Sequence, residues 1–420
     1  MKIFYKLFFI APIFFLSSCL INRQRQVWFG ALQQTHHADT GSVVRIYFDK
    51  QGNLYPERNQ FIPYKNFFDP VKGKKTITEK SQTGNLEFYY TTNKARLNEL
   101  AAYYKLHDAT LTSAKDSFDA VQQIIRRKLI ENLSETGTGN DLKTVVVMIH
   151  GFNDTDPTGD YQLMREAIRK NGYDKGRFVY LEVYWDGLTT NQGNPIYENI
   201  WGRALQNSAY VSLGLRQILS GIDKSINIRI ITHSLGASIG TGAIFNTSTK
   251  WRQNGFRKVG KKLENNYGLN YFEIQKTLLT PVNNTRIGMI APAIPGYNTF
   301  IDFTHRNPAI KISDDNIDKI VVGFNMNDFA VTKRFLGKDL ARYFGSTSLG
   351  CNCERKGIAE LDRAANILID SGYSADMVKQ LLRPVDFSMN ERNKKDEEHG
   401  LYYYLLHTDC VKDFLKELFE

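Results

Sequence analysis

From residue 143 onward, short and almost continuous apolar runs alternate with stretches of helical periodicity, and this alternation restricts the fold more than any other feature of the chain. Strands that are apolar at nearly every position are typical of a parallel sheet with helices on both faces. The alternation predicts a doubly wound α/β domain with a mostly parallel sheet over residues 141–420. The expected strands lie at residues 144–149, 178–183, 226–231, 287–290 and 317–324, and the expected helices at 161–170, 203–219 and 237–245.

Residues 19–140 carry no interpretable motif and are expected to form a separate N-terminal α+β segment of unknown role. The polar residues 134–141, which include two glycines, are expected to link this segment to the main domain. Alternating and apolar patterns predict strands at 42–48 and near 86–90, a turn at 50–53, and amphipathic helices at 93–104 and 114–132.

The first twenty residues have the features of an export signal. Two lysines precede an apolar stretch at 7–16, which is too short to span a bilayer and ends in Leu16-Ser17-Ser18-Cys19. Small residues directly before a cysteine resemble the bacterial lipobox. This resemblance implies that residues 1–18 are a lipoprotein signal peptide and that Cys19 carries the lipid that holds the protein on a membrane surface. An ordinary signal peptide or an uncleaved anchor is the alternative.

The residues that follow Cys19 suggest which membrane is involved. They lack the aspartate that retains many Gram-negative lipoproteins in the inner membrane, so the resemblance implies an outer-membrane anchor that faces the periplasm.

Removal of Lys2 and Lys6 with the signal lowers the formal net charge from +10 to +8. This basic balance favours anionic head groups or polyanions, although an ordinary solvated surface explains it equally well. The longest basic cluster, at 252–262, has no nucleic-acid motif around it, so we expect no nucleic-acid partner.

Three cysteines remain once Cys19 is lipidated, an odd number in a compartment that permits disulfides. A bridge from Cys351 or Cys353 to Cys410 is one expected pairing. The Cys-x-Cys pair lacks the spacing and the partner ligands of a zinc site. An acidic loop at 153–160 is a weaker calcium candidate, because a solvated loop that caps a helix explains it better. We therefore expect no metal and no cofactor.

The strand expected at 226–231 leads into Thr232-His233-Ser234-Leu235-Gly236-Ala237, followed by a helix of small residues. This string resembles the nucleophile elbow of the α/β-hydrolase superfamily, in which a serine on a strained strand-to-helix turn raises its hydroxyl above the sheet. Thr232 departs from the family pattern Gly-x-Ser-x-Gly, whereas Gly236 fits it. The resemblance implies an α/β-hydrolase fold with Ser234 as the nucleophile.

The strand expected at 144–149 ends in His150-Gly151-Phe152-Asn153, which resembles the His-Gly oxyanion loop of esterases and lipases. The resemblance implies that the backbone amides of Phe152 and Leu235 form the oxyanion hole. It also implies that His150 is structural rather than the catalytic base.

In this superfamily the acid and then the base follow the serine along the chain. Asp328 lies just after the strand expected at 317–324, where the family keeps its acid. A helix N-cap is the alternative role for Asp328, and Asp302 is the reserve acid. Only His399 and His407 come later. His399 follows a short expected strand at 384–388 and a charged loop, so it is preferred to His407, which the pattern assigns to the last helix.

The resemblance therefore implies a serine hydrolase that cleaves a carboxylic ester or related acyl bond through Ser234, His399 and Asp328 and an acyl-enzyme. The substrate could be a lipid or an acylated glycan. An acyltransferase, thioesterase or peptidase could use the same residues, and the fold could also serve as a non-catalytic interaction module.

The polar and basic insertion at 246–286 is a candidate cap over the site. The segment 185–187 and the tyrosines at 402–404 could line a substrate pocket or could simply pack in the core.

Overall fold

Seven strands form one central sheet in the computed structural model of the chain. Their order is β11-β8-β7-β6-β3-β4-β2, and every neighbouring pair is parallel. The strands are β2 (Val43–Tyr47), β3 (Lys143–Ile149), β4 (Arg177–Tyr184), β6 (Asn227–His233), β7 (Thr285–Ile290), β8 (Ile317–Phe324) and β11 (Leu382–Asp386). The expected doubly wound parallel sheet is thus confirmed, including the short strand expected near 384–388.

The structure describes residues 24–25, 42–63, 84–106, 112–135, 143–152, 154, 157–174, 177–187, 189–190, 198–245, 284–296, 317–335, 338–344, 347–370, 372–389 and 397–420. The expected signal peptide with Cys19, the reserve acid Asp302 and the expected cap up to residue 283 lie outside these ranges. None of the helices in the described part is long and apolar enough to cross a membrane.

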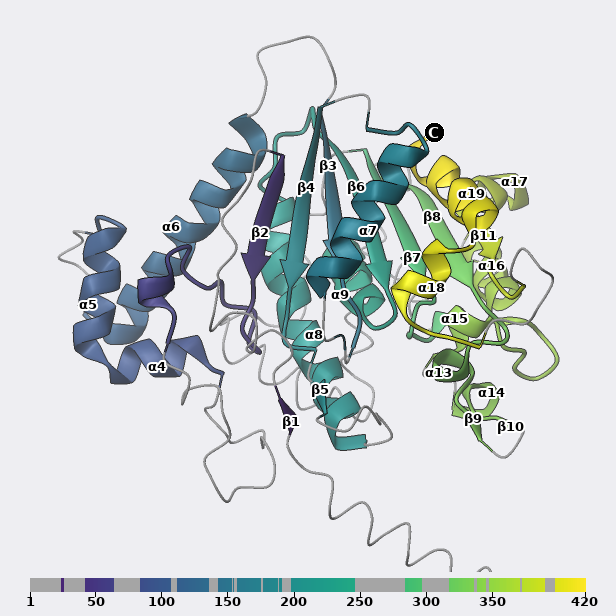
Figure 1. Cartoon of the computed structure of the whole chain (residues 1–420), viewed down its shortest axis with the longest axis horizontal. Helices are drawn as coiled ribbons and strands as arrows, with labels where there is room; N and C mark the ends of the chain where they lie inside the picture. Colours follow the sequence, from purple (N-terminus) through teal and green to yellow (C-terminus); the bar gives the residue numbers. More distant parts are fainter. Residues whose placement is uncertain are drawn as a thin grey trace, which may run out of the picture.

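Helices cover both faces of the sheet (Figure 1). Helices α7 (Pro157–Lys170) and α19 (Thr408–Phe419) lie in front of the strands in this view, and α8 (Glu198–Leu219) and α9 (Gly236–Ile244) lie behind them. Strands β3 and β7 are buried along their whole length, as strands between two helical layers must be. The remaining helices are α4 (Leu86–Thr92), α5 (Lys94–Tyr103), α6 (Ala114–Glu135), α13 (Phe329–Thr332), α14 (Ala341–Phe344), α15 (Ser348–Cys351), α16 (Glu360–Asp370), α17 (Ala375–Leu381) and α18 (Leu401–Leu405), with a 3-10 turn, η1 (Asn59–Phe61).

The strand order reverses direction between β3 and β6. From β3 the chain moves to β4 on one side, and it then returns to the other side of β3, where β6, β7, β8 and β11 follow outward in turn. At such a switch point the loops after the two adjacent strands diverge and leave a crevice at the carboxyl ends of the strands. The residues after β3 and β6 therefore occupy the place where a sheet of this kind binds its ligands.

The N-terminal segment is not separate from the main sheet, contrary to expectation. Strand β2 comes from the expected strand at 42–48, but it pairs with β4 and forms the edge of the central sheet. Arg45 of β2 donates to the buried carboxylate of Glu182 in β4 at 2.8 Å, and Arg165 of α7 also pairs with that carboxylate. This buried ion group joins the edge strand to the rest of the domain.

The strand expected near 86–90 is wrong, because these residues form helix α4. The side chain of Asn85 caps the helix by accepting from the amide of Phe88 at 3.0 Å, and the buried carboxylate of Asp49 accepts from the amide of Leu86 at 2.9 Å. Two satisfied amides at the first turn favour a helix over a strand. The expected helices at 93–104 and 114–132 are confirmed as α5 and α6, and α6 extends into the first residues of the expected linker.

The cysteine pairing differs from the expected one. Cys351 forms a disulfide with Cys353, and Cys410 is a free thiol. The two bridged residues flank Asn352, whose left-handed backbone (φ 46°) ends α15 and turns the chain sharply. This turn brings the two sulfur atoms together within one loop. Two short antiparallel strand pairs lie outside the central sheet in the described part of the chain: β1 (Gln24–Arg25) pairs with the distant β5 (Thr189–Thr190), and β9 (Arg334–Phe335) forms a hairpin with β10 (Lys338–Asp339).

Candidate active site

Ser234 lies on a strained turn between β6 and α9. Its backbone is left-handed, with φ of 52°, a conformation that a non-glycine residue adopts only where its surroundings impose it. The amide of Ser234 donates to the carbonyl of Ile290 at 3.0 Å, and its carbonyl accepts from the amide of Ala293 at 3.0 Å. These bonds to the last residue of β7 and to the loop after it hold the serine in place. The residue is almost fully buried, so only a small part of it meets solvent.

Glycines allow the neighbouring segments to approach this turn closely. A Cβ at Gly236 would lie 2.5 Å from the carbonyl oxygen of His150, and a Cβ at Gly151 would lie 2.9 Å from Cβ of Ser234. Real Cβ atoms do not make such contacts, so any larger residue would push the end of β3 away from the serine. The glycines therefore bring the loop after β3 against the turn that carries Ser234.

His399 connects Ser234 to Asp328. Its Nε2 lies 2.7 Å from Oγ of Ser234, and its Nδ1 lies 2.6 Å from Oδ2 of Asp328. The three residues come from different loops at the carboxyl edge of the sheet, after β6, after β8 and before α18. His407, the alternative base, is buried at the start of α19, where its ring packs against Phe387 at 6.0 Å. The structure thus brings His399, and not His407, to the serine.

Asp328 is both a helix cap and the partner of His399. Its Oδ1 accepts from the amides of Ala330 and Val331, which makes it the N-cap of α13, while its other oxygen accepts from His399. The two roles weighed from the sequence are therefore compatible, because the carboxylate offers two oxygens. Burial opposes ionisation, but the charge and hydrogen bond of His399 outweigh it and hold the pKa of Asp328 below its usual range.

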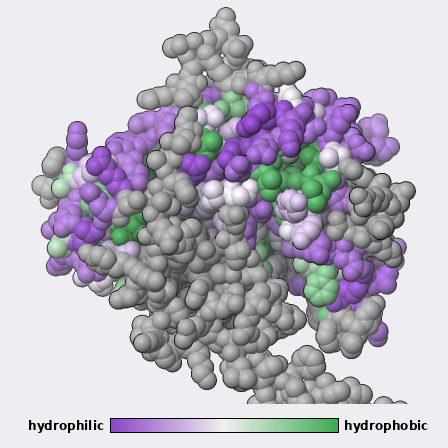
Figure 2. Space-filling view, viewed as in Figure 1, coloured by the Kyte–Doolittle hydropathy of each residue, from purple (hydrophilic) through white to green (hydrophobic). Residues whose placement is uncertain are grey.

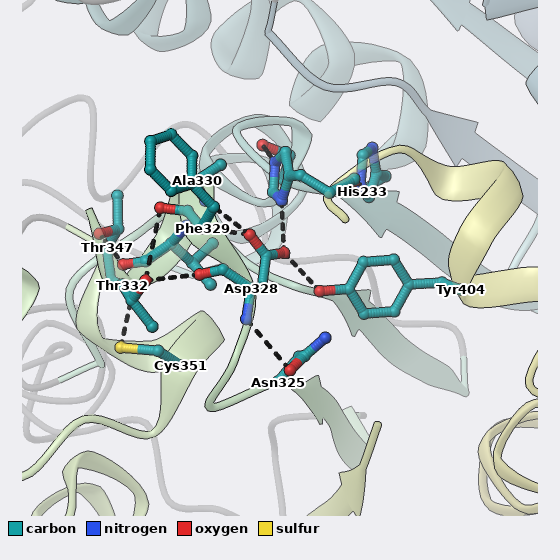
Figure 3. Close-up of polar contacts among 12 residues, drawn as sticks. His233, Asn325, Asp328, Phe329, Ala330, Thr332, Thr347, Cys351 and Tyr404 are labelled. Carbon is teal, nitrogen blue, oxygen red and sulfur yellow. Dashed lines mark hydrogen bonds and ion pairs between the residues drawn. The ribbon is translucent and has the colours of Figure 1, made fainter. Parts of the chain in front are cut away.

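Tyr404 is a site residue that the sequence did not assign. Figure 3 shows its hydroxyl directed at the carboxylate of Asp328, and the hydroxyl donates to the same Oδ2 that accepts from His399. This bond also helps to lower the pKa of Asp328. Tyr404 lies in α18, just after His399, and is buried. The sequence identified it only as one of three neighbouring tyrosines, and nothing in that pattern distinguishes the buried one.

The loop that carries Asp328 is fixed by its own polar side chains. Oδ1 of Asn325 accepts from the amides of Asn327 (2.8 Å) and Asp328 (3.2 Å), so the chain turns sharply after β8. The amide of Asn325 donates to the carbonyl of Gly350 in α15 at 2.8 Å. Asn327 also donates its side-chain amide to the carbonyl of Ser388, which joins this loop to the one after β11. The acid is therefore held by its own turn and by two neighbouring segments.

His150 is buried, in keeping with the structural role that the resemblance implies. Its Nδ1 lies 2.9 Å from the carbonyl of Gly151, and its Nε2 accepts from the amide of Trp185 at 3.2 Å. Burial lowers the pKa of His150 to about 4, so the ring is neutral at ordinary pH. Trp185 is completely buried and stacks on the ring of His150 at 5.7 Å. It therefore belongs to the core rather than to a substrate pocket.

The two amides predicted for the oxyanion hole, those of Phe152 and Leu235, have no hydrogen-bond partner among the described residues. Leu235 is the residue before α9, so its amide lies at the N-terminus of a helix, where unpaired donors favour negative charge. The side chain of Phe152 packs edge-on against Trp201 of α8 at 5.3 Å, and the ammonium of Lys333 lies 5.1 Å above the Trp201 ring. These contacts fix the loop after β3 from the outside.

Several exposed apolar and aromatic side chains lie within about ten positions of Asp328 or His399 along the chain. They are Met326, Phe329, Met389, Tyr402, Tyr403 and Leu406. Figure 2 shows hydrophobic surface at the position that α18 has in Figure 1. Tyr402 and Tyr403 are therefore available to a ligand, in contrast to Tyr404.

Within the described ranges, no group of three or more histidine, cysteine or acidic side chains could hold a metal ion, and Asn153 and Asp156 of the acidic loop lie outside those ranges.

Comparison with known proteins gives no match: the chain matches no protein-family model and no curated protein.

Proposed function

We propose that this chain is a serine hydrolase of the α/β-hydrolase type, and that it cleaves a carboxylic ester or a related acyl bond. The observation that supports the proposal best is the continuous hydrogen-bonded series from Oγ of Ser234 through His399 to Asp328. A serine hydroxyl becomes a strong nucleophile only when an adjacent base takes its proton, and the base needs a carboxylate to fix its tautomer. The imidazole of His399 lies within hydrogen-bond reach of both Ser234 and Asp328.

The proposed reaction has two steps. Oγ of Ser234 attacks the acyl carbon while Nε2 of His399 takes its proton, and the amides of Phe152 and Leu235 donate to the oxygen that becomes negative. His399 then gives the proton to the leaving oxygen, which departs as an alcohol and leaves an acyl-enzyme. In the second step water attacks this ester while His399 takes a proton from the water. His399 then returns that proton to Oγ of Ser234 as the acyl–oxygen bond breaks, which frees the serine and releases a carboxylic acid. Asp328 stays ionised throughout and stabilises the charged ring of His399.

The apolar side chains around the site favour an acyl group as the recognised part of the substrate. Phe329 and Met326 flank Asp328, and Tyr402, Tyr403 and Leu406 follow His399. Burial of an acyl chain against such side chains would supply about 0.8 kcal/mol for each methylene group. A lipid or an acylated glycan carries such a chain, and both are substrates that fit the proposal.

We further propose that Cys19 is acylated and anchors the enzyme to a membrane, with the outer membrane as its expected location. The support is the sequence Leu16-Ser17-Ser18-Cys19 after an apolar stretch with two lysines. Metabolic labelling with a fatty-acid probe tests the anchor. The label should be incorporated into the wild type and lost in Cys19→Ala. Equal labelling of both proteins would exclude lipidation at Cys19.

The proposed activity is tested with a panel of aryl esters of graded acyl length. Wild type should release the aryl alcohol from several of them, and Ser234→Ala should abolish turnover because the nucleophile is missing. Ser238→Ala is the matched control, since Ser238 is a buried serine of the adjacent helix α9 and contacts Ser208 at 3.0 Å. Turnover in Ser234→Ala equal to that of Ser238→Ala would disprove the assignment.

A further inference from the structure

His233 makes a contact that the reaction described above does not use. It is the last residue of β6, directly before Ser234, and it is buried. Its Nε2 lies 2.8 Å from the backbone carbonyl oxygen of His399. A carbonyl oxygen can only accept, so Nε2 of His233 must carry the hydrogen. The residue before the nucleophile therefore donates to the backbone of the base.

The surroundings of His233 keep its ring neutral and in one orientation. Burial, followed by the charge of His399, lowers the pKa of His233 to about 3. A Cβ at Gly151 would lie only 3.2 Å from Nδ1 of the ring, so that glycine allows the loop after β3 to pack against it. The rings of His399 and Tyr404 lie 5.0 Å and 6.1 Å away on other sides. A side chain packed in this way is a preorganised donor.

The segment before His399 is fixed at a second point as well. The amide of Phe329, in α13, donates to the carbonyl of Glu397 at 3.1 Å. The loop with the base is therefore tied to the acid loop at Glu397 and to the nucleophile strand at His399. These two bonds act on the backbone, whereas Ser234 and Asp328 act on the imidazole of His399.

We propose that His233 is a positioning residue, whose Nε2–H holds the backbone of His399 so that the imidazole of His399 stays within reach of Ser234. This inference rests on the proposed function. Misplacement of a reacting group by about 1 Å can cost about 100-fold in rate, so loss of this bond should lower kcat and leave KM largely unchanged. In this proposal His233 acts on the backbone of His399 and not on the substrate. An effect on kcat without an effect on KM therefore distinguishes positioning of the base from substrate binding.

The test compares three substitutions at His233 in the full-length protein, with aryl-ester kinetics and circular-dichroism melting curves to count folded molecules. His233→Gln keeps an N–H at nearly the same reach, so it should retain kcat within a few-fold of wild type. His233→Leu fills the space without a donor, and His233→Asn has a donor that is too short. Both should lose about 10- to 100-fold in kcat per folded molecule. Asn also covers the case in which Leu fails to fold.

Two results would overturn the inference. Either all three variants equal wild type in kcat per folded molecule, or His233→Gln falls as low as His233→Leu. In both cases the wild-type protein would still hydrolyse the esters. The proposed function would then remain supported, and only the proposed role of His233 would be disproved. If the wild-type protein itself hydrolyses none of the esters, the proposed function fails first, and the role of His233 fails with it.

Discussion

The side-chain methyl group of Thr232 occupies the space that a side chain at position 240 would need: a Cβ at Gly240 would lie 2.7 Å from Cγ2 of Thr232. Thr232 stands where the nucleophile-elbow pattern has its first glycine, and it is buried. The bulk added at this position of the strand is therefore offset by a missing side chain on α9. This explains how the chain departs from the pattern and still forms the turn.

A double-mutant cycle tests this compensation. Gly240→Ala alone should lower the free energy of unfolding by about 1–3 kcal/mol, because the new methyl group overpacks against Thr232. In a Thr232→Ala background the closest contact is removed and Cδ1 of Ile287, at 3.1 Å, becomes the nearest atom, so the same change should cost less. Urea unfolding of the four proteins measures the coupling energy. Additive effects within error would show that the two positions are independent.

His399 and His407 should respond differently to replacement by alanine. His399→Ala should lower kcat by several orders of magnitude with little change in Tm, since the residual rate comes from binding and the oxyanion donors. His407→Ala should lower Tm, because the ring is buried against Phe387, and it should spare kcat per folded molecule. Kinetics and melting curves on both variants distinguish the two roles. Near-normal turnover of His399→Ala with an unchanged Tm would refute its role as the base.

The buried histidines should make the fold sensitive to mild acid. Burial lowers the pKa of His150 to about 4, well below the usual value of about 6.5 for an unfolded chain. Between these two values the unfolded state binds a proton that the folded state does not, so stability must fall as pH falls. The expected slope is about 1.4 kcal/mol per pH unit for this residue. Urea unfolding of wild type and His150→Gln between pH 7 and pH 4 measures it, and equal slopes would contradict the lowered pKa.

The disulfide assignment predicts which thiol reacts. In a form that lacks residues 1–19, Cys410 should be alkylated without reduction, while Cys351 and Cys353 should react only after a reductant is added. A bridge that closes so short a loop removes little chain entropy from the unfolded state. Cys353→Ser should therefore cost only about 1–2 kcal/mol. A peptide that links Cys410 to either of the others, found by mass mapping, would disprove the pairing.

The strands of the central sheet could be predicted because strands buried on both faces are apolar at nearly every position. Strand β2 could not be assigned to that sheet from its sequence. Its pattern is broken by Arg45, and the partner that explains this charge, Glu182, is 137 positions away. Helix α4 was mistaken for a strand because an apolar run of that length fits either structure. The decisive contact, from its Leu86 amide to Asp49, is also distant in sequence.

The site residues also fall into those that local sequence motifs identified and those that depend on contacts between distant parts of the chain. Ser234, Asp328 and His399 were identified through the resemblance of their local motifs and through their order along the chain. His233 and Tyr404 were missed because their contacts depend on the fold. His233 meets a carbonyl 166 positions away, and Tyr404 meets a carboxylate 76 positions away. A histidine before the nucleophile and a tyrosine among tyrosines carry no signal of these partners in a single sequence.

Covalent labelling with a fluorophosphonate probe tests the central claim most directly. The probe reacts only with a serine that a neighbouring base has activated, and it needs no knowledge of the substrate. After labelling of the folded wild type, peptide mapping should place a single adduct on Ser234. The adduct should be absent from Ser234→Ala and should form far more slowly in His399→Ala. An adduct on a different serine, or full labelling of Ser234→Ala, would contradict the account.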